Sequence, residues 1–566
     1  MLCLQSVFYN STSRVPGAIR LTEGINQFLE MCFRKVTFDS PDLDFMKTII
    51  SILLPFLFLS SYGQNISKSP VMAKPEFSFA EIAWHDSDIT CIVTDQGGIN
   101  GDIRHTVHLF TANGHPFNEE AKVTTRHSLQ HEMNFTLNKT LFFLKTHRNE
   151  TARVRLQALT IEYKERGIRE GKFDIFSIDK EEENKKLRSE LYKFNAYEGL
   201  HKKQQLITYN NDYKEEFPEG FMYRTVDQYQ QFSELRTLQL PYPDPQCNIR
   251  TVLYDDQSEQ LYILCDLFEV KGNNRTFKHH FLYKHDIASG KGSILRDEMR
   301  GFEEKRLVTF LDSSEIIFGG IEIPGRKSKA IEYSLLRLSR FDGSTIGQQQ
   351  GALSTALTQE FMSVYNSRSS EMLRPLKILK DENGRIHFFW KYAATIDDVA
   401  GEDRNPVFIP VTGSFIATAI VFSLNIADGS LNHDMSTALV WLSMKDDQIR
   451  EHVLIDSLKT SDLNTHGFYP LLLNNQARVM YNRPTEPTLT FIQPALLFET
   501  ENGTERDNTF KNTLKELQIN TVFGMSHFTD KNDDYFLTGY NPMSDPYETD
   551  ARKRVELMLM TIHNRD

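Results

Sequence analysis

The stretch Thr251-Val252-Leu253-Tyr254 runs into Asp255-Asp256-Gln257-Ser258-Glu259-Gln260 and is followed at once by Leu261-Tyr262-Ile263-Leu264-Cys265. Aliphatic, β-branched and aromatic residues suit a pleated, half-buried strand. Aspartate side chains bond their own nearby backbone and therefore favour tight turns. The stretch predicts a β-hairpin whose turn lies at residues 255–260.

This order of strand, Asp- or Asn-rich turn and strand recurs along the chain. Clear copies lie at 307–318, 376–390, 470–481 and 525–537, and weaker ones turn near residues 87, 138 and 199. A third strand is predicted after several hairpins, at 281–283, 335–338 and 417–424, and a fourth at 293–295. Units of four strands repeated in this way are typical of propeller blades. We therefore expect an all-β fold, a single β-propeller of seven or eight four-stranded blades.

Two features of this expected ring leave alternatives open. The interval between the turns near 382 and 475 is longer than the others and needs an insertion or a missed unit. Residues 555–562 read as the third strand of the last unit, and we expect 77–80 to supply its outermost strand and close the ring. A two-domain β-sandwich protein is the alternative fold, because sandwiches also have short strands and regular turns.

The turn Asp381-Glu382-Asn383-Gly384, followed by Arg385-Ile386-His387-Phe388-Phe389, resembles a hairpin found in many bacterial secreted β-propeller repeat proteins. The resemblance covers most of 75–566 as architecture. It implies the propeller superfold and names no family within it.

A secretory signal peptide is predicted within the chain. Met46 and Lys47 precede an apolar run, 49–59, and the small residues Ser61 and Gly63 follow it. A basic head, about ten apolar residues and a small-residue exit are typical of such signals. We expect 1–45 to be a mis-called N-terminal extension, 46–63 the signal peptide and 64–566 the propeller domain. A buried segment, a membrane anchor and a genuine cytoplasmic extension are the alternatives.

The composition narrows the class of protein. Charged residues make up 25% and aromatic residues 11%, as in a folded globular chain. The net charge of −12 argues against a general binder of nucleic acid, which needs a basic stripe. Three cysteines follow residue 64, namely Cys91, Cys247 and Cys265, and they are too few for a disulfide framework. Cys247 and Cys265 flank one hairpin out of register, so buried free thiols are expected, with a bond as the alternative.

No motif in the sequence names a reaction. It contains no Gly-x-Ser-x-Gly, no His-Glu-x-x-His and no Cys-x-x-Cys. His105 and His108 lie three apart in an expected strand and point to opposite faces. The turn that begins at Asp530 lacks the central glycine of a calcium loop. We therefore predict no metal site and no cofactor.

The long loop 393–413 is the best sequence-based guess at a binding site. It carries four acidic residues and follows two aromatic ones, and together these are Trp390, Tyr392, Asp397, Asp398, Glu402 and Asp403. Long loops on rigid scaffolds often carry function, and acidic groups beside aromatic rings suit a sugar or a cation. A solvated insertion is the alternative interpretation.

These observations favour an exported β-propeller that acts as a binding or scaffold module for an envelope protein or glycan. We expect an extracytoplasmic protein, periplasmic or secreted, that is a monomer without a transmembrane segment after cleavage. A carbohydrate-active hydrolase or lyase with a central-pocket active site is the alternative. Two carboxylates on different blades need only meet in space, so spacing in the sequence does not exclude an enzyme.

Overall fold

The computed structural model describes residues 65–563, with gaps of which the longest are 180–192, 396–434 and 541–555. Residues 64–566 cluster as one compact unit. The expected signal segment, 46–63, and the residues before it lie outside the described part of the chain.

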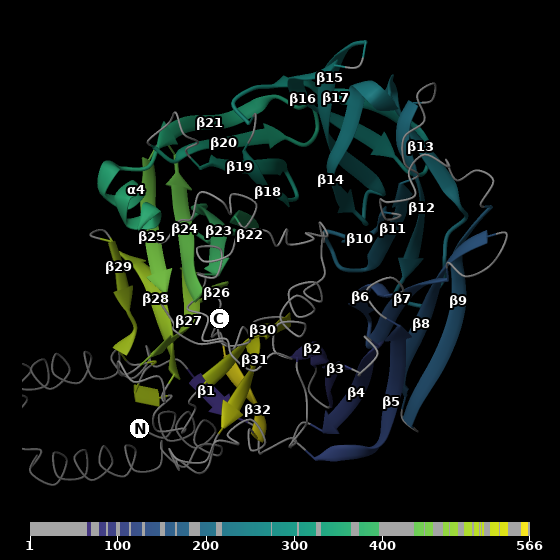
Figure 1. Ribbon diagram of the computed structural model, residues 1–566, viewed down its shortest axis with the longest axis vertical. Coiled ribbons are helices and arrows are strands. Elements are labelled where there is room, and N and C mark those ends of the chain that lie inside the picture. Colours follow the sequence, from purple (N-terminus) through teal and green to yellow (C-terminus); the bar gives the residue numbers. More distant parts are fainter. Residues whose placement is uncertain are drawn as a thin grey trace, which may run out of the picture. The chain divides into compact units, whose positions relative to one another are not determined.

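The described residues form eight four-stranded sheets, in which neighbouring strands pair in antiparallel fashion (Figure 1). We call the sheets blades 1 to 8 in chain order. Blade 1 consists of β2 (Phe79–His85), β3 (Ile89–Gly97), β4 (Asp102–Thr111) and β5 (Pro116–Arg126), and blade 2 of β6 (His131–Leu137), β7 (Thr140–His147), β8 (Arg153–Lys164) and β9 (Gly167–Asp179). Blade 3 consists of β10 (Lys193–Glu198), β11 (Gln204–Asn210), β12 (Pro218–Asp227) and β13 (Arg236–Pro243), and blade 4 of β14 (Cys247–Asp255), β15 (Gln260–Lys271), β16 (Asn274–Asp286) and β17 (Lys291–Met299).

The remaining blades follow the same plan. Blade 5 consists of β18 (Arg306–Leu311), β19 (Glu315–Glu322), β20 (Glu332–Ser339) and β21 (Thr345–Ala352), and blade 6 of β22 (Leu373–Lys380), β23 (Ile386–Thr395), β24 (Met435–Lys445) and β25 (Gln448–Asp456). Blade 7 consists of β26 (Phe468–Leu473), β27 (Gln476–Pro484), β28 (Ile492–Thr500) and β29 (Gly503–Arg506), and blade 8 of β30 (Thr521–Asp530), β31 (Asp533–Tyr540), β32 (Glu556–His563) and β1 (Asn65–Lys68). A 3₁₀ turn, η1 (Asp244–Gln246), precedes β14, and the helix α4 (Thr355–Met362) follows β21.

The first strands of the blades form a closed ring. Each first strand lies against the first strand of the next blade, in the order β2, β6, β10, β14, β18, β22, β26 and β30, and β30 returns to β2. A ring of four-stranded blades is a β-propeller. The expectation of seven or eight blades is confirmed, and the closed ring excludes the two-domain β-sandwich.

Ring closure uses a different N-terminal strand from the one expected. β1 pairs antiparallel with β32, from Asn65 opposite His563 to Lys68 opposite Met560. Figure 1 shows β1 beside β32 in the last sheet. The proposal that 77–80 closes the ring is wrong, because Phe79 and Ala80 begin β2, the first strand of blade 1.

The hydrophobic core lies between consecutive blades. One cluster joins blades 3 and 4 through Phe221, Leu238 and Phe281, and similar clusters join blades 5 and 6 and blades 6 and 7. The second strand of a blade is covered on both faces, and β19 is buried along seven of its eight residues. This explains why the second strands read as continuous apolar runs.

The long interval in the sequence is an insertion inside blade 6. β23 ends at Thr395 and pairs directly with β24, so 396–434 lies between its second and third strands. The strand expected at 417–424 falls outside the described residues, and β24 takes the third place that we had assigned to it. Among the described residues, the structure contains no helix whose length and apolar content would let it cross a membrane.

The three described cysteines are free and buried. Cys247 lies opposite Leu267, and Ile249 lies opposite Cys265, so the two thiols are out of register, as the sequence indicates. Burial raises the pKa of the Cys265 thiol above its ordinary value. Such a thiol is a weak nucleophile.

Candidate functional site

The turns of blades 3 to 6 place polar side chains at one end of the propeller. Strands in a blade alternate in direction, so the turns after its first and third strands lie at the same end. Gly199 and Tyr254 form a parallel bridge, which shows that blades 3 and 4 present their first turns side by side. We call this end the turn end; in blades 3 to 5 it comprises the turns 199–203, 228–235, 256–259, 287–290, 312–314 and 340–344, and the first turn of blade 6, 381–385, lies there too.

The Asp256 carboxylate binds the first turn of blade 3 to that of blade 4. Its oxygens accept backbone N–H bonds from His201 at 2.8 Å, Lys203 at 2.7 Å and Gln204 at 3.1 Å. A Cβ atom at Gly199 would lie 2.4 Å from Asp256 Cγ, so only glycine allows this approach. The buried Asp256 carboxylate of blade 4 therefore satisfies backbone N–H donors of the neighbouring blade 3.

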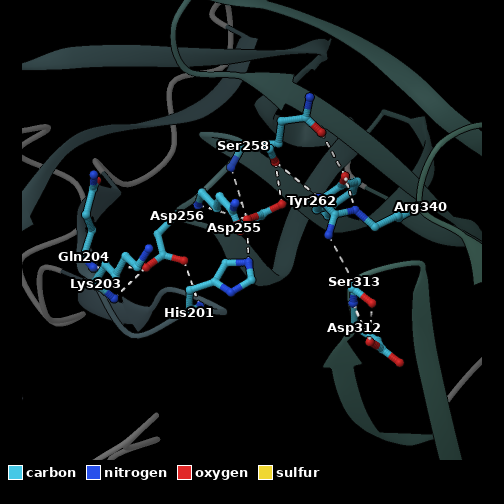
Figure 2. A network of polar contacts seen from close by, with 12 residues as sticks. His201, Lys203, Gln204, Asp255, Asp256, Ser258, Tyr262, Asp312, Ser313 and Arg340 are labelled. Carbon is cyan, nitrogen blue, oxygen red and sulfur yellow. Dashed lines mark hydrogen bonds and ion pairs between the residues drawn. The ribbon is translucent and has the colours of Figure 1, made fainter.

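The adjacent Asp255 binds blade 4 to blade 5. Arg340, at the turn after β20, donates to Asp255 Oδ2 and reaches the Tyr262 hydroxyl at 3.3 Å (Figure 2). Ser258 also donates to Asp255. Burial alone would raise the pKa of Asp255, but the bonds from Ser258 and Arg340 outweigh burial and lower it. The turn aspartate is therefore held as an anion.

A third contact binds blade 5 to blade 6. Lys380 Nζ lies 2.5 Å from Asp312 Oδ2 and 2.6 Å from Glu315 Oε1, and Arg337 Nε lies 2.7 Å from Glu315 Oε2. Burial acts to raise the pKa of Glu315, and the bonds from Arg337 and Lys380 lower it overall. We call the residues of these three contacts the inter-blade network; they are His201, Asp255, Asp256, Asp312, Glu315, Arg337, Arg340 and Lys380.

Part of this network has the composition of a metal site. His201, Asp255 and Asp256 offer ligand atoms within 4.8 Å of one another, the only such group of three among the described residues. Their oxygens already accept bonds from backbone N–H groups, from Ser258 and from the Arg340 guanidinium. A cation bound to Asp255 would lie next to that positive charge, which opposes its binding. We therefore assign these side chains to the joining of blades.

Two exposed aromatic rings project from the turn end on either side of blade 4. Tyr229, in the turn after β12, is 71% exposed, and Phe341, in the turn after β20, is 68% exposed. Asp227 Oδ1 accepts the backbone N–H groups of Tyr229 and Gln231, each at 2.9 Å. The Arg340 guanidinium lies 5.8 Å from the centre of the Phe341 ring. Ordered turns thus keep both rings exposed to water, although aromatic side chains are more often buried.

The structure describes only the two aromatic residues of the binding site that the sequence predicts. Trp390 and Tyr392 lie on β23 and are fully buried, and the Trp390 indole N–H donates to the Arg306 carbonyl at 2.9 Å. These rings belong to the core between blades 5 and 6. Asp397, Asp398, Glu402 and Asp403 lie outside the described residues, so a site in their loop stays a prediction.

Sequence reasoning missed Tyr229, Phe341 and Arg340. Phe341 precedes the turn residues Asp342-Gly343-Ser344, and an aromatic residue beside such a turn is exposed unless another element covers it. The partner of Arg340 is 85 residues away in the sequence. No local pattern predicts such a contact.

A pair of carboxyl groups lies between blades 3 and 4, near β12 and η1. Glu219 is buried, its side chain accepts from the Gly220 N–H at 3.0 Å and from Asn210 Nδ2 at 3.4 Å, and it shares a hydrogen bond with Asp244. Burial and the neighbouring Asp244 charge raise the pKa of Glu219 to about 7. Two close carboxyl groups cannot both ionise easily, so Glu219 keeps its proton near neutral pH.

Comparison with known proteins gives similarity of fold alone. No family model matches the chain, and no curated protein matches it. Pyrococcus horikoshii acylaminoacyl peptidase is 10% identical over 84% of this chain and 60% of that one, with a TM-score of 0.31, so the chain spans about three-fifths of its length. The β-propeller domain of the trilobed protease from Pyrococcus furiosus is 10% identical over 76% and 96%, with a TM-score of 0.32. The WD40 domain of SCAP from fission yeast is 7% identical over 76% and 95%, with a TM-score of 0.31.

Proposed function

We propose that this propeller is a binding or scaffold module that takes an envelope protein or glycan at the turn end of blades 3 to 5. The observation that carries the proposal is the pair of exposed rings, Tyr229 and Phe341, held by ordered turns on either side of blade 4. Exposed aromatic rings contribute most of the binding energy at many protein interfaces, and they also stack against apolar faces of sugars.

The inter-blade network supports this proposal by fixing the turns of blades 3 to 5 relative to one another. Asp255, Asp256 and Arg340 join these three blades at the turn end (Figure 2), from which both rings project. A preformed surface loses little conformational entropy when a ligand binds. The arrangement therefore suits recognition, and it needs no reacting group.

The test compares the chain 64–566 with its Tyr229→Ala/Phe341→Ala variant on immobilised envelope extract and on a glycan array. We expect the native chain to bind one of the two and the variant to bind at least about tenfold more weakly. Ile294→Ala on β17, another exposed apolar residue, is the matched control and should bind like the native chain. Failure to bind either material, or equal binding by the double variant, would contradict the proposal.

The proposed location rests on the sequence of 46–63 alone. If that segment directs export, the exported protein begins near Gln64, shortly before β1. N-terminal sequencing of protein recovered from outside the cytoplasm tests this. A first residue upstream of Met46 would exclude a mis-called start.

One observation favours the alternative, a carbohydrate-active hydrolase or lyase. The pKa of about 7 at Glu219, beside Asp244, suits a general acid. Glu219 is only 6% exposed, however, and it lies between blades 3 and 4. Hydrolysis of an envelope glycan that is lost in Glu219→Gln and retained in Tyr229→Ala/Phe341→Ala would replace the binding proposal with the enzymatic one.

A further inference from the structure

The outermost strand of a blade has an unpaired edge, and most of these edges are protected. Proteins guard such edges with charged residues, proline or short length, because an open edge pairs with other strands. Seven described outer strands contain a charged residue, and two of them contain proline as well; these are β1, β5, β9, β13, β17, β25 and β29.

β21, the outer strand of blade 5, lacks every one of these protections. Its sequence is Thr345-Ile-Gly-Gln-Gln-Gln-Gly-Ala352, eight residues without charge or proline. Ile346 is 49% exposed, and Gln348, Gln350 and Ala352 are exposed as well. Ile346 is one of the eight large exposed apolar residues of the described chain.

The free edge of β21 carries backbone groups that can pair. Among the described residues its one strand partner is β20. Leu353 N–H donates to the Ile331 carbonyl at 2.9 Å, so residue 353 faces β20. Alternate residues of an antiparallel strand bond to opposite sides. The N–H and C=O groups of Gln348, Gln350 and Ala352 therefore point away from β20.

The middle five residues of β21 read the same in both directions about Gln349. Gly347-Gln348-Gln349-Gln350-Gly351 is a palindrome, with Ile346 and Ala352 at its ends. Two copies related by a two-fold axis at Gln349 would pair Gln348 with Gln350 and Gly347 with Gly351, and the outward-facing residues would meet each other. Opposed glutamine amides exchange donor and acceptor, and Ile346 meets the small Ala352.

We propose that β21 is a dimerisation edge, which joins blade 5 of two copies of this chain into one continuous eight-stranded antiparallel sheet. The occupant is a second copy because no charge on the strand repels its twin and because the exposed Gln348 and Gln350 side chains can hydrogen-bond to each other across the two-fold axis. The sequence alone led us to expect a monomer, and the unprotected edge argues against that expectation. The residues of β21 include neither Tyr229 nor Phe341, so the two proposals have separate tests.

The test is sedimentation equilibrium of the chain 64–566 over a wide range of concentration. We expect a monomer–dimer equilibrium for the native chain. The variants Gln348→Lys/Gln350→Lys and Gln348→Glu/Gln350→Glu each place like charges opposite each other, and each should raise the dimer dissociation constant at least about tenfold. An equimolar mixture of the two should form a heterodimer, which shows that both are folded.

Ser293→Lys on β17, an outer strand that already carries charge, is the matched control and should leave the dimer intact. A monomer at every concentration overturns the proposal, as does a dimer that the lysine and glutamate variants leave unchanged. Failure of the mixed variants to associate would also overturn it, provided that their thermal unfolding matches that of the native chain.

Discussion

At the scale of single residues, Glu219 makes the stability of the fold depend on pH. Its pKa is about 7 in the folded chain, against an ordinary value of 4.5. A raised acid pKa means that the folded state binds the extra proton, so the stability it contributes is present below pH 4.5 and is lost as the pH rises through 7. The loss amounts to a few kcal/mol at most, since each pKa unit corresponds to about 1.4 kcal/mol.

We expect Glu219→Gln to be more stable than the native chain at pH 8 and of similar stability at pH 4.5. The amide keeps the acceptor for Gly220 and Asn210 and supplies a permanent N–H to Asp244. Urea unfolding at the two pH values measures the difference. An equal change at both would show that the substitution acts through packing and not through the proton.

Arg340 is expected to contribute more to stability than any exposed ion pair. Its guanidinium serves Asp255, whose side chain is almost fully buried, so Arg340→Met leaves a buried anion without its cation. Loss of one partner in a buried pair costs about 3 kcal/mol or more. Arg300→Met removes a partner of Glu298, but the Arg300 side chain is 77% exposed and water screens the pair, so this substitution should cost much less. Chemical unfolding measures both.

The double variant Asp255→Asn/Arg340→Met shows whether the unpaired buried charge causes the loss of stability in Arg340→Met. Because it removes the buried charge as well, it should recover part of the stability lost in Arg340→Met. A double variant that is less stable than Arg340→Met would mean that Asp255 acts mainly through the turn bonds to Gln257 and Ser258. The sequence predicted these turn bonds from Asp255 alone, but the stabilising partner comes from the next blade.

At the scale of elements, the inner hairpins were predictable because their information is local. The eight turns expected near residues 87, 138, 199, 257, 313, 382, 475 and 532 all lie between the first and second strands of a blade. Asp, Asn and Gly determine a turn within a few residues, and apolar runs determine the strands on either side. The third strand of blade 6 was missed because 39 residues separate it from β23, and an apolar run at 417–424 lies closer.

The closing strand was misplaced for a similar reason. Asn65-Ile66-Ser67-Lys68 is short and polar, whereas Phe77-Ser78-Phe79-Ala80 has the alternation of a strand. An outer strand gains its stability from backbone bonds to one neighbour, so its side chains need little apolar character. β1 therefore forms because the edge of β32 lacks a partner strand, and β32 is far away in the sequence.

Removal of β1 provides an element-scale prediction. The chain 69–566 leaves the edge of β32 unpaired along four residues that β1 otherwise covers. A few backbone hydrogen bonds are lost, each worth about 1 kcal/mol, so we expect a lower unfolding temperature than that of 64–566. We also expect a greater tendency to aggregate, because β32 is largely apolar and its edge would be open. Calorimetry and light scattering measure the two effects, and identical behaviour of the two chains would show that β1 contributes nothing.

At the scale of the whole molecule, groups on different blades oppose one another as the pH changes. Burial lowers the pKa of His285 and of His387 below 6.5, so the stability they contribute is present above pH 6.5 and lost as the pH falls. Glu219 acts in the opposite direction between pH 7 and pH 4.5. The turn-end carboxylates Asp255 and Glu315 have lowered pKa values, so their contribution is lost only at pH values below about 4.

We therefore expect the native chain to show a broad plateau of stability between about pH 4.5 and pH 7, with a steep loss on the acid side when the carboxylates of the inter-blade network become protonated. The plateau arises because the effect of Glu219 cancels that of the two histidines, and Glu219→Gln removes the effect of Glu219. In that variant the histidines act without opposition, so stability should rise steadily from pH 4.5 to pH 7. Urea midpoints measured at half-unit intervals for both chains decide the matter. A variant profile that stays flat would show that His285 and His387 contribute little to the dependence of stability on pH.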